Sequence, residues 1–177
     1  MIHHPVLRQL ADSGVKLGLD TVRGFLQAQG EPHRAYPVVH VAGTNGKGSV
    51  CTMVTAALVD AGYRVGTTVS PHLEAVNERV RIDGKPIDDA ALSDAIGSLD
   101  RARMDWGRSQ GMREAPLTYF EFMICLAFQV FAKRQVDVAV VEVGLGGRLD
   151  ATNVVRPQVC AITHVGMDHQ DMLGDTI

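Results

Sequence analysis

The chain has 177 residues, of which 46% are hydrophobic and 21% are charged, and its formal net charge at pH 7 is −3. This composition is ordinary for one folded globular unit and excludes a disordered or fibrous chain. Charges of both signs are interspersed, so no broad basic field supports nucleic-acid binding. No apolar run could span a bilayer, and the first residues lack the pattern of a signal peptide. We therefore expect a cytoplasmic protein with no membrane partner.

The first half of the chain alternates helical and strand patterns. The amphipathic spacing, candidate caps and glycine stops indicate the following order. The expected elements are helix 5–12, a helix from Asp20 as N-cap to near Gly30, strand 38–42, a helix from Ser49 to Gly62 with Met53 on its apolar face, strand 63–69, a loop over 70–77 and a hairpin over 79–84.

The second half continues in the same way. We expect a helix from Asp88 as N-cap toward Trp106, a polar linker over 107–116, helix 118–134, strand 136–143, a loop over 144–158 and strand 159–163. Apolar strands that alternate with helices indicate a mostly parallel sheet flanked by helices, which is the α/β class.

Three cysteines, Cys51, Cys125 and Cys160, lie far apart in apolar surroundings. An odd number of widely separated cysteines does not favour a disulfide framework or a metal site. We expect each of them to be a reduced core residue.

A glycine-rich loop follows strand 38–42 and opens a helix. Its residues are Gly43, Thr44, Asn45, Gly46, Lys47, Gly48 and Ser49. A loop of this kind points backbone N–H groups, a helix N-terminus and an ammonium group at one anion, which suits a nucleotide polyphosphate. The sequence therefore predicts ATP binding here.

This loop departs from the usual phosphate-loop pattern. Val41 stands where that pattern has glycine, and Gly48 displaces the hydroxyl to Ser49. The glycine spacing does not fit a dinucleotide fingerprint either. The alternative interpretation is a structural turn with a solvated lysine.

Three candidate magnesium ligands, Ser70, Glu142 and His169, lie at or just past the ends of expected strands. Ligands of parallel α/β sheets lie beyond the carboxyl ends of the strands, and a carboxylate there needs a partner such as hydrated Mg²⁺. Glu142 could instead cap a helix or pair with an arginine, and His169 alone could be an ordinary loop histidine.

The loop from Gly144 to Asn153 carries glycines beside Arg148 and Asp150. Glycines let the backbone approach a ligand closely. The same residues could equally form a tight turn in which Asp150 caps the next segment.

Five ordered motifs together resemble the folylpolyglutamate synthase/dihydrofolate synthase family of the Mur ligase superfamily. They are G-T-N-G-K-G-S at 43–49, S-P-H-L at 70–73, L-T-Y-F-E at 117–121, E-V-G-L-G-G-R-L-D-A-T-N at 142–153 and D-H at 168–169. The resemblance implies that ATP phosphorylates the carboxylate of dihydropteroate or a folate, and that L-glutamate then attacks the acyl phosphate.

The resemblance also implies residue roles. Lys47, with the rest of the glycine-rich loop, would hold the ATP phosphates; Ser70 and Glu142 would bind one Mg²⁺, and His169 another. The implied pterin contacts are Val15, Lys16, Leu17, Gly18, Thr118, Tyr119, Phe120, Glu121, Leu149, Asp150 and Ala151.

Members of this family are longer than 177 residues, so we interpret residues 1–177 as the N-terminal part of the ATP-binding domain, with no C-terminal glutamate-ligase domain. We expect this piece not to turn over alone, to have an unpaired sheet edge and to show either self-association or marginal stability, whereas the full-length family pattern is monomeric. Two alternatives stay open: a Mur-type peptidoglycan ligase and a nucleotide-binding module without catalysis.

Overall fold

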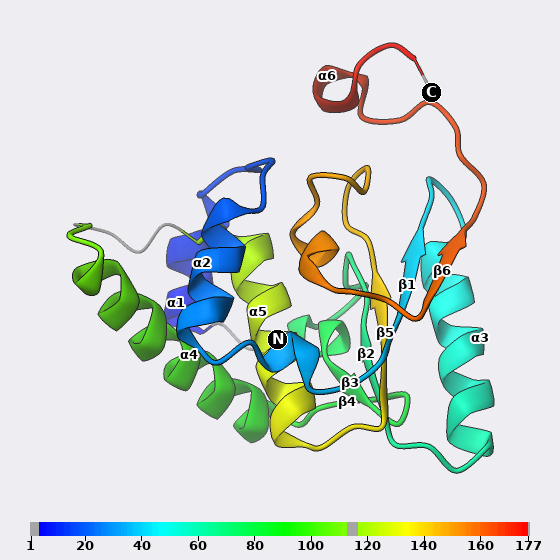
Figure 1. Cartoon of the computed structure of the whole chain (residues 1–177), viewed down its shortest axis with the longest axis horizontal. Coiled ribbons are helices and arrows are strands. Elements are labelled where there is room, and N and C mark those ends of the chain that lie inside the picture. Colours follow the sequence, from blue (N-terminus) through cyan, green and yellow to red (C-terminus); the bar gives the residue numbers. More distant parts are fainter. Residues whose placement is uncertain (1–3, 113–116, 177) are drawn as a thin grey trace.

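A mixed sheet organises the computed structural model, which describes residues 4–112 and 117–176. Six strands occur within these residues, in the order β4-β3-β2-β5-β1-β6 (Figure 1). Their bounds are β1 (Val38–Ala42), β2 (Val65–Thr68), β3 (Arg81–Ile82), β4 (Lys85–Pro86), β5 (Val138–Glu142) and β6 (Val159–Ile162). β1, β2, β5 and β6 are parallel, and β3 and β4 form an antiparallel hairpin at one edge. The predicted mostly parallel α/β fold is confirmed.

Helices cover both faces of the sheet unequally. Figure 1 shows α3 on one side and α1, α2, α4 and α5 on the other. The helices are α1 (Pro5–Ala11), α2 (Asp20–Ala28), α3 (Lys47–Asp60), α4 (Asp89–Ser109), α5 (Tyr119–Lys133) and α6 (Gln170–Leu173), with short 3-10 turns η1 (Pro32–Arg34), η2 (Val76–Arg79) and η3 (Ala151–Val154). None of the described helices is long and apolar enough to cross a membrane.

The alternation of side chains along β5 builds both layers of the core. Val138 and Val140 belong to the small cluster under α3, whereas Ala139 and Val141 belong to the large cluster that contains the buried face of α5. Successive side chains of a strand point to opposite faces, so an uninterrupted apolar strand is what a sheet covered on both sides requires.

Side-chain caps fix where the two long helices begin. Asp88 Oδ1 accepts a hydrogen bond from Ala91 N at 2.7 Å and starts α4, as predicted. Thr118 and Glu121 form a capping box at the start of α5, in which Glu121 Oε2 accepts from Thr118 N at 2.7 Å.

Several predicted boundaries are corrected. Asp20 lies in the first turn of α2, whose N-cap position is Leu19, and α3 begins at Lys47 rather than Ser49. α4 continues through Ser109 into the predicted linker 107–116, of which residues 113–116 lie outside the described residues. The predicted hairpin is present but spans 81–86 rather than 79–84, because Arg79 belongs to η2; its turn lies at Asp83 and Gly84, which both have positive φ.

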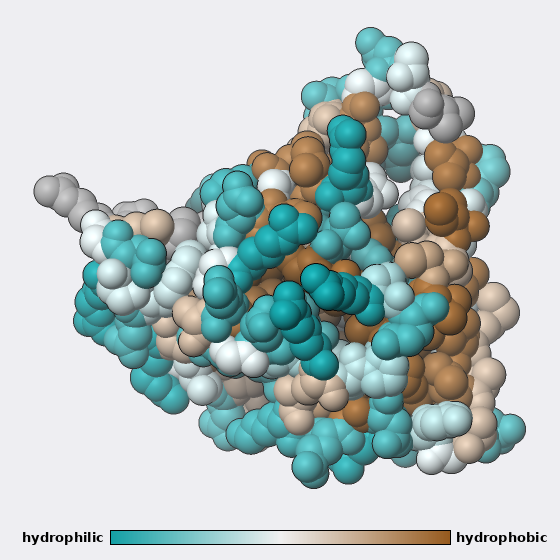
Figure 2. Space-filling model, viewed as in Figure 1, coloured by the Kyte–Doolittle hydropathy of each residue, from teal (hydrophilic) through white to brown (hydrophobic). Residues whose placement is uncertain are grey.

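The edge strand β6 is exposed. Val159 is 54% exposed and Ile162 72%, and the expectation that Cys160 is a core residue is wrong because it also lies on this edge. Met53, expected on the buried face of α3, is 62% exposed because one helix alone covers this side of the sheet. Figure 2 shows apolar surface over α3 and β6. Within the part of the chain that the structure describes, β6 pairs with β1 alone, so the expected unpaired edge is confirmed there; self-association or marginal stability stays a prediction.

Candidate functional site

The glycine-rich loop connects β1 to α3 in the predicted order of strand, loop and helix. Gly43 has φ +129°, and a Cβ there would lie 2.0 Å from Thr163 Oγ1, so only glycine fits. Gly46, with φ +85°, is the N-cap of α3 and offers no side-chain cap. The first N–H groups of this 14-residue helix therefore stay available to an anion.

The segment after β6 holds the loop in place. Thr44 N donates to His164 O at 2.8 Å, and Asn45 forms an isolated bridge with His164. The Thr44 hydroxyl donates to Gly166 O and accepts from Gly166 N, both at 3.0 Å. Lys47 Nζ donates to Thr44 O at 3.1 Å, which folds the ammonium group back over the loop.

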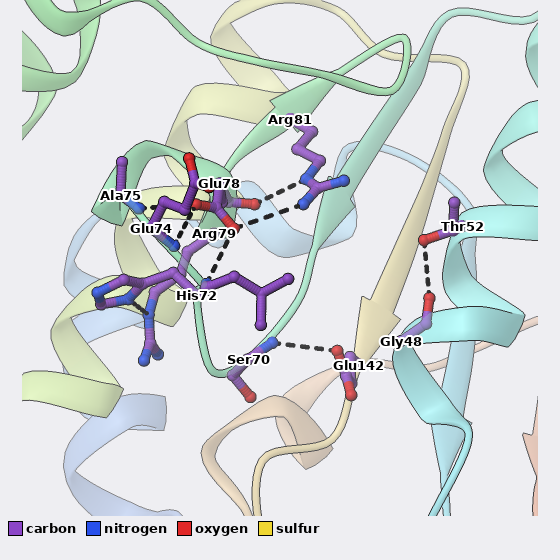
Figure 3. Close-up of polar contacts among 11 residues, drawn as sticks. Gly48, Thr52, Ser70, His72, Glu74, Ala75, Glu78, Arg79, Arg81 and Glu142 are labelled. Carbon is purple, nitrogen blue, oxygen red and sulfur yellow. Dashed lines mark hydrogen bonds and ion pairs between the residues drawn. The ribbon is translucent and has the colours of Figure 1, made fainter.

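Glu142 ends β5 next to this loop. Its side chain is 5% exposed, and its Oε2 accepts a hydrogen bond from Ser70 N at 3.0 Å (Figure 3). A Cβ on Gly48 would lie 3.7 and 3.8 Å from the two carboxylate oxygens, so the carboxylate faces the start of α3. Burial raises the pKa of the Glu142 carboxyl, and the Ser70 N–H and the Lys47 charge oppose this rise.

Glu78 shapes the loop that carries Ser70. Its carboxylate accepts from the backbone N–H groups of Leu73, Glu74 and Ala75 at 3.0, 2.8 and 2.6 Å (Figure 3). These hydrogen bonds lower the pKa of Glu78 to about 2. Arg81 Nη2 lies 4.0 Å from the same carboxylate. The loop 70–78 therefore has one defined course beside the start of α3.

A cavity of about 290 Å³ brings together most of the predicted pterin contacts. Its wall comes from segments far apart in the sequence. The apolar ring of Phe120 forms part of this wall. The lining residues from the predicted set are Val15, Lys16, Leu17, Thr118, Phe120, Leu149, Asp150 and Ala151, and Ser70 and His169 line it as well.

Three predicted pterin contacts do not line this cavity. Glu121 is 2% exposed and serves the capping box of α5. The ring of Tyr119 lies 5.4 Å below the Arg79 guanidinium, and Gly18 N donates to Leu149 O at 3.2 Å. These residues support the wall rather than face the cavity.

Asp150 caps η3, which confirms the tight-turn interpretation, and it also lines the cavity, whereas contact of this loop with a ligand stays a prediction. Its carboxylate accepts from Leu145 N at 2.8 Å and from Thr152 N at 3.0 Å, and the latter bond starts η3. Gly144 permits this course, because a Cβ there would lie 2.4 Å from the Phe120 ring and 3.0 Å from Asp150 Oδ2.

The three predicted magnesium ligands are only partly assembled. Ser70 contacts Glu142 and shares the 290 Å³ cavity with His169, but His169 and Glu142 line different cavities. The described residues contain no group of three or more His, Cys, Asp or Glu side chains that could hold a metal ion. Glu142 and Ser70 nevertheless supply hard oxygen donors, and no ion pair among the described residues involves Glu142. This donor set fits Mg²⁺, which keeps several waters and takes phosphate oxygens as further ligands.

Sequence reasoning missed Arg79 and Pro71, which also line the cavity. Arg79 Nε donates to His72 Nδ1 at 2.9 Å, and the guanidinium stacks on Tyr119. Its place as the first residue of the predicted hairpin 79–84 gave no signal, because the cavity arises only when α5 packs behind that loop.

Comparison with known proteins decides the family. Residues 41–176 match the Mur ligase middle domain. The chain belongs to this family. Its glycine-rich loop and Glu142 therefore lie in the matched part of a Mur ligase middle domain, together with the segments 117–121 and 142–153.

The proteins that are similar to this chain include enzymes of folate metabolism. Over 99% of its length the chain is 38% identical to the dihydrofolate synthase/folylpolyglutamate synthase of Mycobacterium tuberculosis, and it spans 37% of that relative. The structure of Escherichia coli FolC in complex with DHPP and ADP matches 97% of the chain with a TM-score of 0.87 and 38% identity, and the chain covers 40% of it. A bifunctional folylpolyglutamate synthase/dihydrofolate synthase with Mn, AMPPNP and L-glutamate bound matches 96% of the chain with a TM-score of 0.83 and 40% identity, and the chain likewise covers 40% of it.

Proposed function

We propose that this chain is the part of an ATP-dependent folate ligase that holds ATP, a divalent cation and the pterin substrate. The observation that carries the proposal is adjacency: the 290 Å³ cavity shares Ser70 and Pro71 with the groove beside the phosphate loop and Glu142. It also shares Gly144, Leu145 and His169 with the cavity that Lys47 lines. Phosphoryl transfer requires the acceptor and the γ-phosphate to be held side by side.

In this proposal the residues divide the work. The N-terminus of α3 and Lys47 bind the phosphates, and Ser70 and Glu142 hold one Mg²⁺ with His169 near a second. Bound Mg²⁺ would neutralise charge on the transferring phosphoryl group. The similar structures that contain ADP with DHPP, and Mn with AMPPNP and L-glutamate, support this assignment of ligands.

The apolar cavity fits a flat pterin better than a sugar-linked peptide. Phe120 and Leu149 offer apolar surface, and Asp150 offers a carboxylate to N–H donors of the ring. The carboxylate of dihydropteroate or a folate would then become an acyl phosphate, and the amine of L-glutamate would form the amide.

Binding and turnover measurements test the proposal separately. Calorimetry with dihydropteroate, in the presence of AMPPCP and Mg²⁺, should show one saturable site on the chain. Because the chain alone is not expected to turn over, ADP release is measured with a full-length ligase that contains it, and dihydropteroate with glutamate is compared with UDP-linked muropeptide substrates and with no acceptor. Binding or turnover only with the muropeptide substrates would indicate a peptidoglycan ligase. Nucleotide binding together with no binding or turnover of either acceptor would indicate a binding module.

A further inference from the structure

A chain of buried polar groups joins β1 to the loop after β5. His40 Nε2 lies 2.9 Å from Thr152 Oγ1, although the two residues are 112 positions apart in the sequence. Thr152 Oγ1 in turn hydrogen-bonds to Asp150 Oδ1. All three side chains are buried, with exposed fractions of 7% for His40, 0% for Thr152 and 4% for Asp150.

The direction of each hydrogen bond follows from the chemistry of the groups. An ionised carboxylate only accepts, so the Thr152 hydroxyl donates its single hydrogen to Asp150. The hydroxyl oxygen must then accept from His40, which therefore carries its hydrogen on Nε2. Burial lowers the pKa of His40, with the Asp150 charge opposing the shift, and this agrees with a neutral imidazole as the donor.

These bonds distribute the acceptor positions of Asp150 unequally. Oδ1 receives two donors, the N–H and the hydroxyl of Thr152, whereas Oδ2 receives the N–H of Leu145. A carboxylate oxygen accepts about two hydrogen bonds. Among the described residues, then, Oδ1 is saturated and Oδ2 keeps one position, on a side chain that lines the 290 Å³ cavity.

We propose that His40 and Thr152 are positioning residues that hold the Asp150 carboxylate so that Oδ2 offers its remaining acceptor position to an N–H donor of the bound heterocycle. Neither residue lines the cavity, so both act through Asp150. The identity of the N–H donor rests on the proposed function, in which the substrate is a pterin. The hydrogen bonds that orient the Asp150 carboxylate are present without a ligand.

The test removes one hydroxyl and keeps the shape. Thr152→Val should weaken binding of dihydropteroate by about 10-fold, because a hydrogen bond to a charged group is lost, while AMPPCP affinity stays within about two-fold. Thr152→Ser, which keeps the hydroxyl, should restore dihydropteroate binding. An unchanged affinity in Thr152→Val, or equal loss of both ligands, would overturn the proposal.

The chain offers a matched control on the other face of the sheet. Thr55 is 3% exposed, and its hydroxyl lies 2.7 Å from that of Thr67. Thr55→Val also removes a buried hydroxyl but should leave dihydropteroate affinity within about two-fold. His40→Phe should weaken binding by about three-fold and His40→Gln, which keeps a donor near the Nε2 position, should not. If His40→Phe behaves like wild type, the role of His40 is refuted.

A second measurement needs no ligand. Amide hydrogen exchange of Leu145, followed by NMR, reports whether Asp150 Oδ2 still accepts from that N–H. Exchange should accelerate about 10-fold in Thr152→Val and stay unchanged in Thr152→Ser and Thr55→Val. Equal exchange in Thr152→Val and wild type would refute the positioning role even if dihydropteroate does not bind, whereas accelerated exchange without any dihydropteroate binding would count against the proposed function alone.

Discussion

Two carboxylates at the same end of the sheet are equally buried but differently paired. Asp150, 4% exposed, accepts from the N–H groups of Leu145 and Thr152 and from the Thr152 hydroxyl. Glu142, 5% exposed, accepts from Ser70 N alone and has no ion-pair partner among the described residues. Burial of a charge is costly unless it is paired, so the first carboxylate fixes a loop, and a cation bound by the second, as proposed above, would offset the cost of its burial.

The largest effect is expected from exchanging each carboxylate for its amide. Asp150→Asn should lower the free energy of unfolding by about 2 kcal/mol, because an NH₂ group then faces buried donors. Glu142→Gln should change it by less than about 0.5 kcal/mol, because the amide oxygen still accepts from Ser70 N. Urea denaturation measures the free energy of unfolding of both variants. Equal losses would show that the two carboxylates do not differ in their structural role.

Lys47→Ala removes the ammonium group that folds over the glycine-rich loop. The variant should bind ATP about 10- to 100-fold more weakly, because a charged contact to phosphate is lost, with little change in stability. Calorimetry with AMPPCP checks this. Lys133→Ala, on α5 and away from the loop, is the control and should bind like wild type.

Magnesium dependence sharpens the assignment of Glu142. In Glu142→Gln the gain in nucleotide affinity that Mg²⁺ gives should fall by about 10-fold, because an amide cannot offset the charge of the cation. Nucleotide titrations with Mg²⁺ and with EDTA are compared for the wild type, Glu142→Gln and Asp150→Asn. If Mg²⁺ helps both variants as much as the wild type, Glu142 is a structural carboxylate like Asp150.

The smallest effect concerns Glu78, which holds the loop that brings Ser70 to Glu142. Its pKa is lowered from 4.5 to about 2 by the N–H groups of Leu73, Ala75 and Glu74. A carboxyl with a lowered pKa stabilises the fold above its unfolded-state value, and that contribution disappears as pH falls from 4.5 toward 2.

The melting temperature should therefore fall from pH 5 to pH 3 by about 2 °C more in the wild type than in Glu78→Gln. Thermal melts at the two pH values measure the difference, and Glu74→Gln is the neighbouring control. Parallel pH dependence in wild type and Glu78→Gln would show that the loop does not depend on this carboxylate.

The sequence by itself determined the α/β class and the strand that precedes the glycine-rich loop. These two features depend on local patterns: an apolar strand, glycines that permit positive φ, and a capping residue such as Thr118. The segments that meet at the cavity were predicted from the family resemblance and not from local patterns. Element ends differed from the predicted ones by one to three residues, as for α3 and α4, because the last hydrogen bonds of an element depend on its neighbours.

Only the tertiary structure decided the pairing of distant groups. Cys160 is exposed because β6 lies at the sheet edge, which depends on strand order and not on the apolar residues around the cysteine. His40 lies 112 positions from Thr152, and Arg79 stacks on Tyr119 across two separate elements. No local pattern encodes such contacts, because they form only when β1, the loop after β5 and α5 pack together. This packing buries both carboxylates, and it leaves Asp150 with three hydrogen bonds and Glu142 with the single bond from Ser70 N among the described residues.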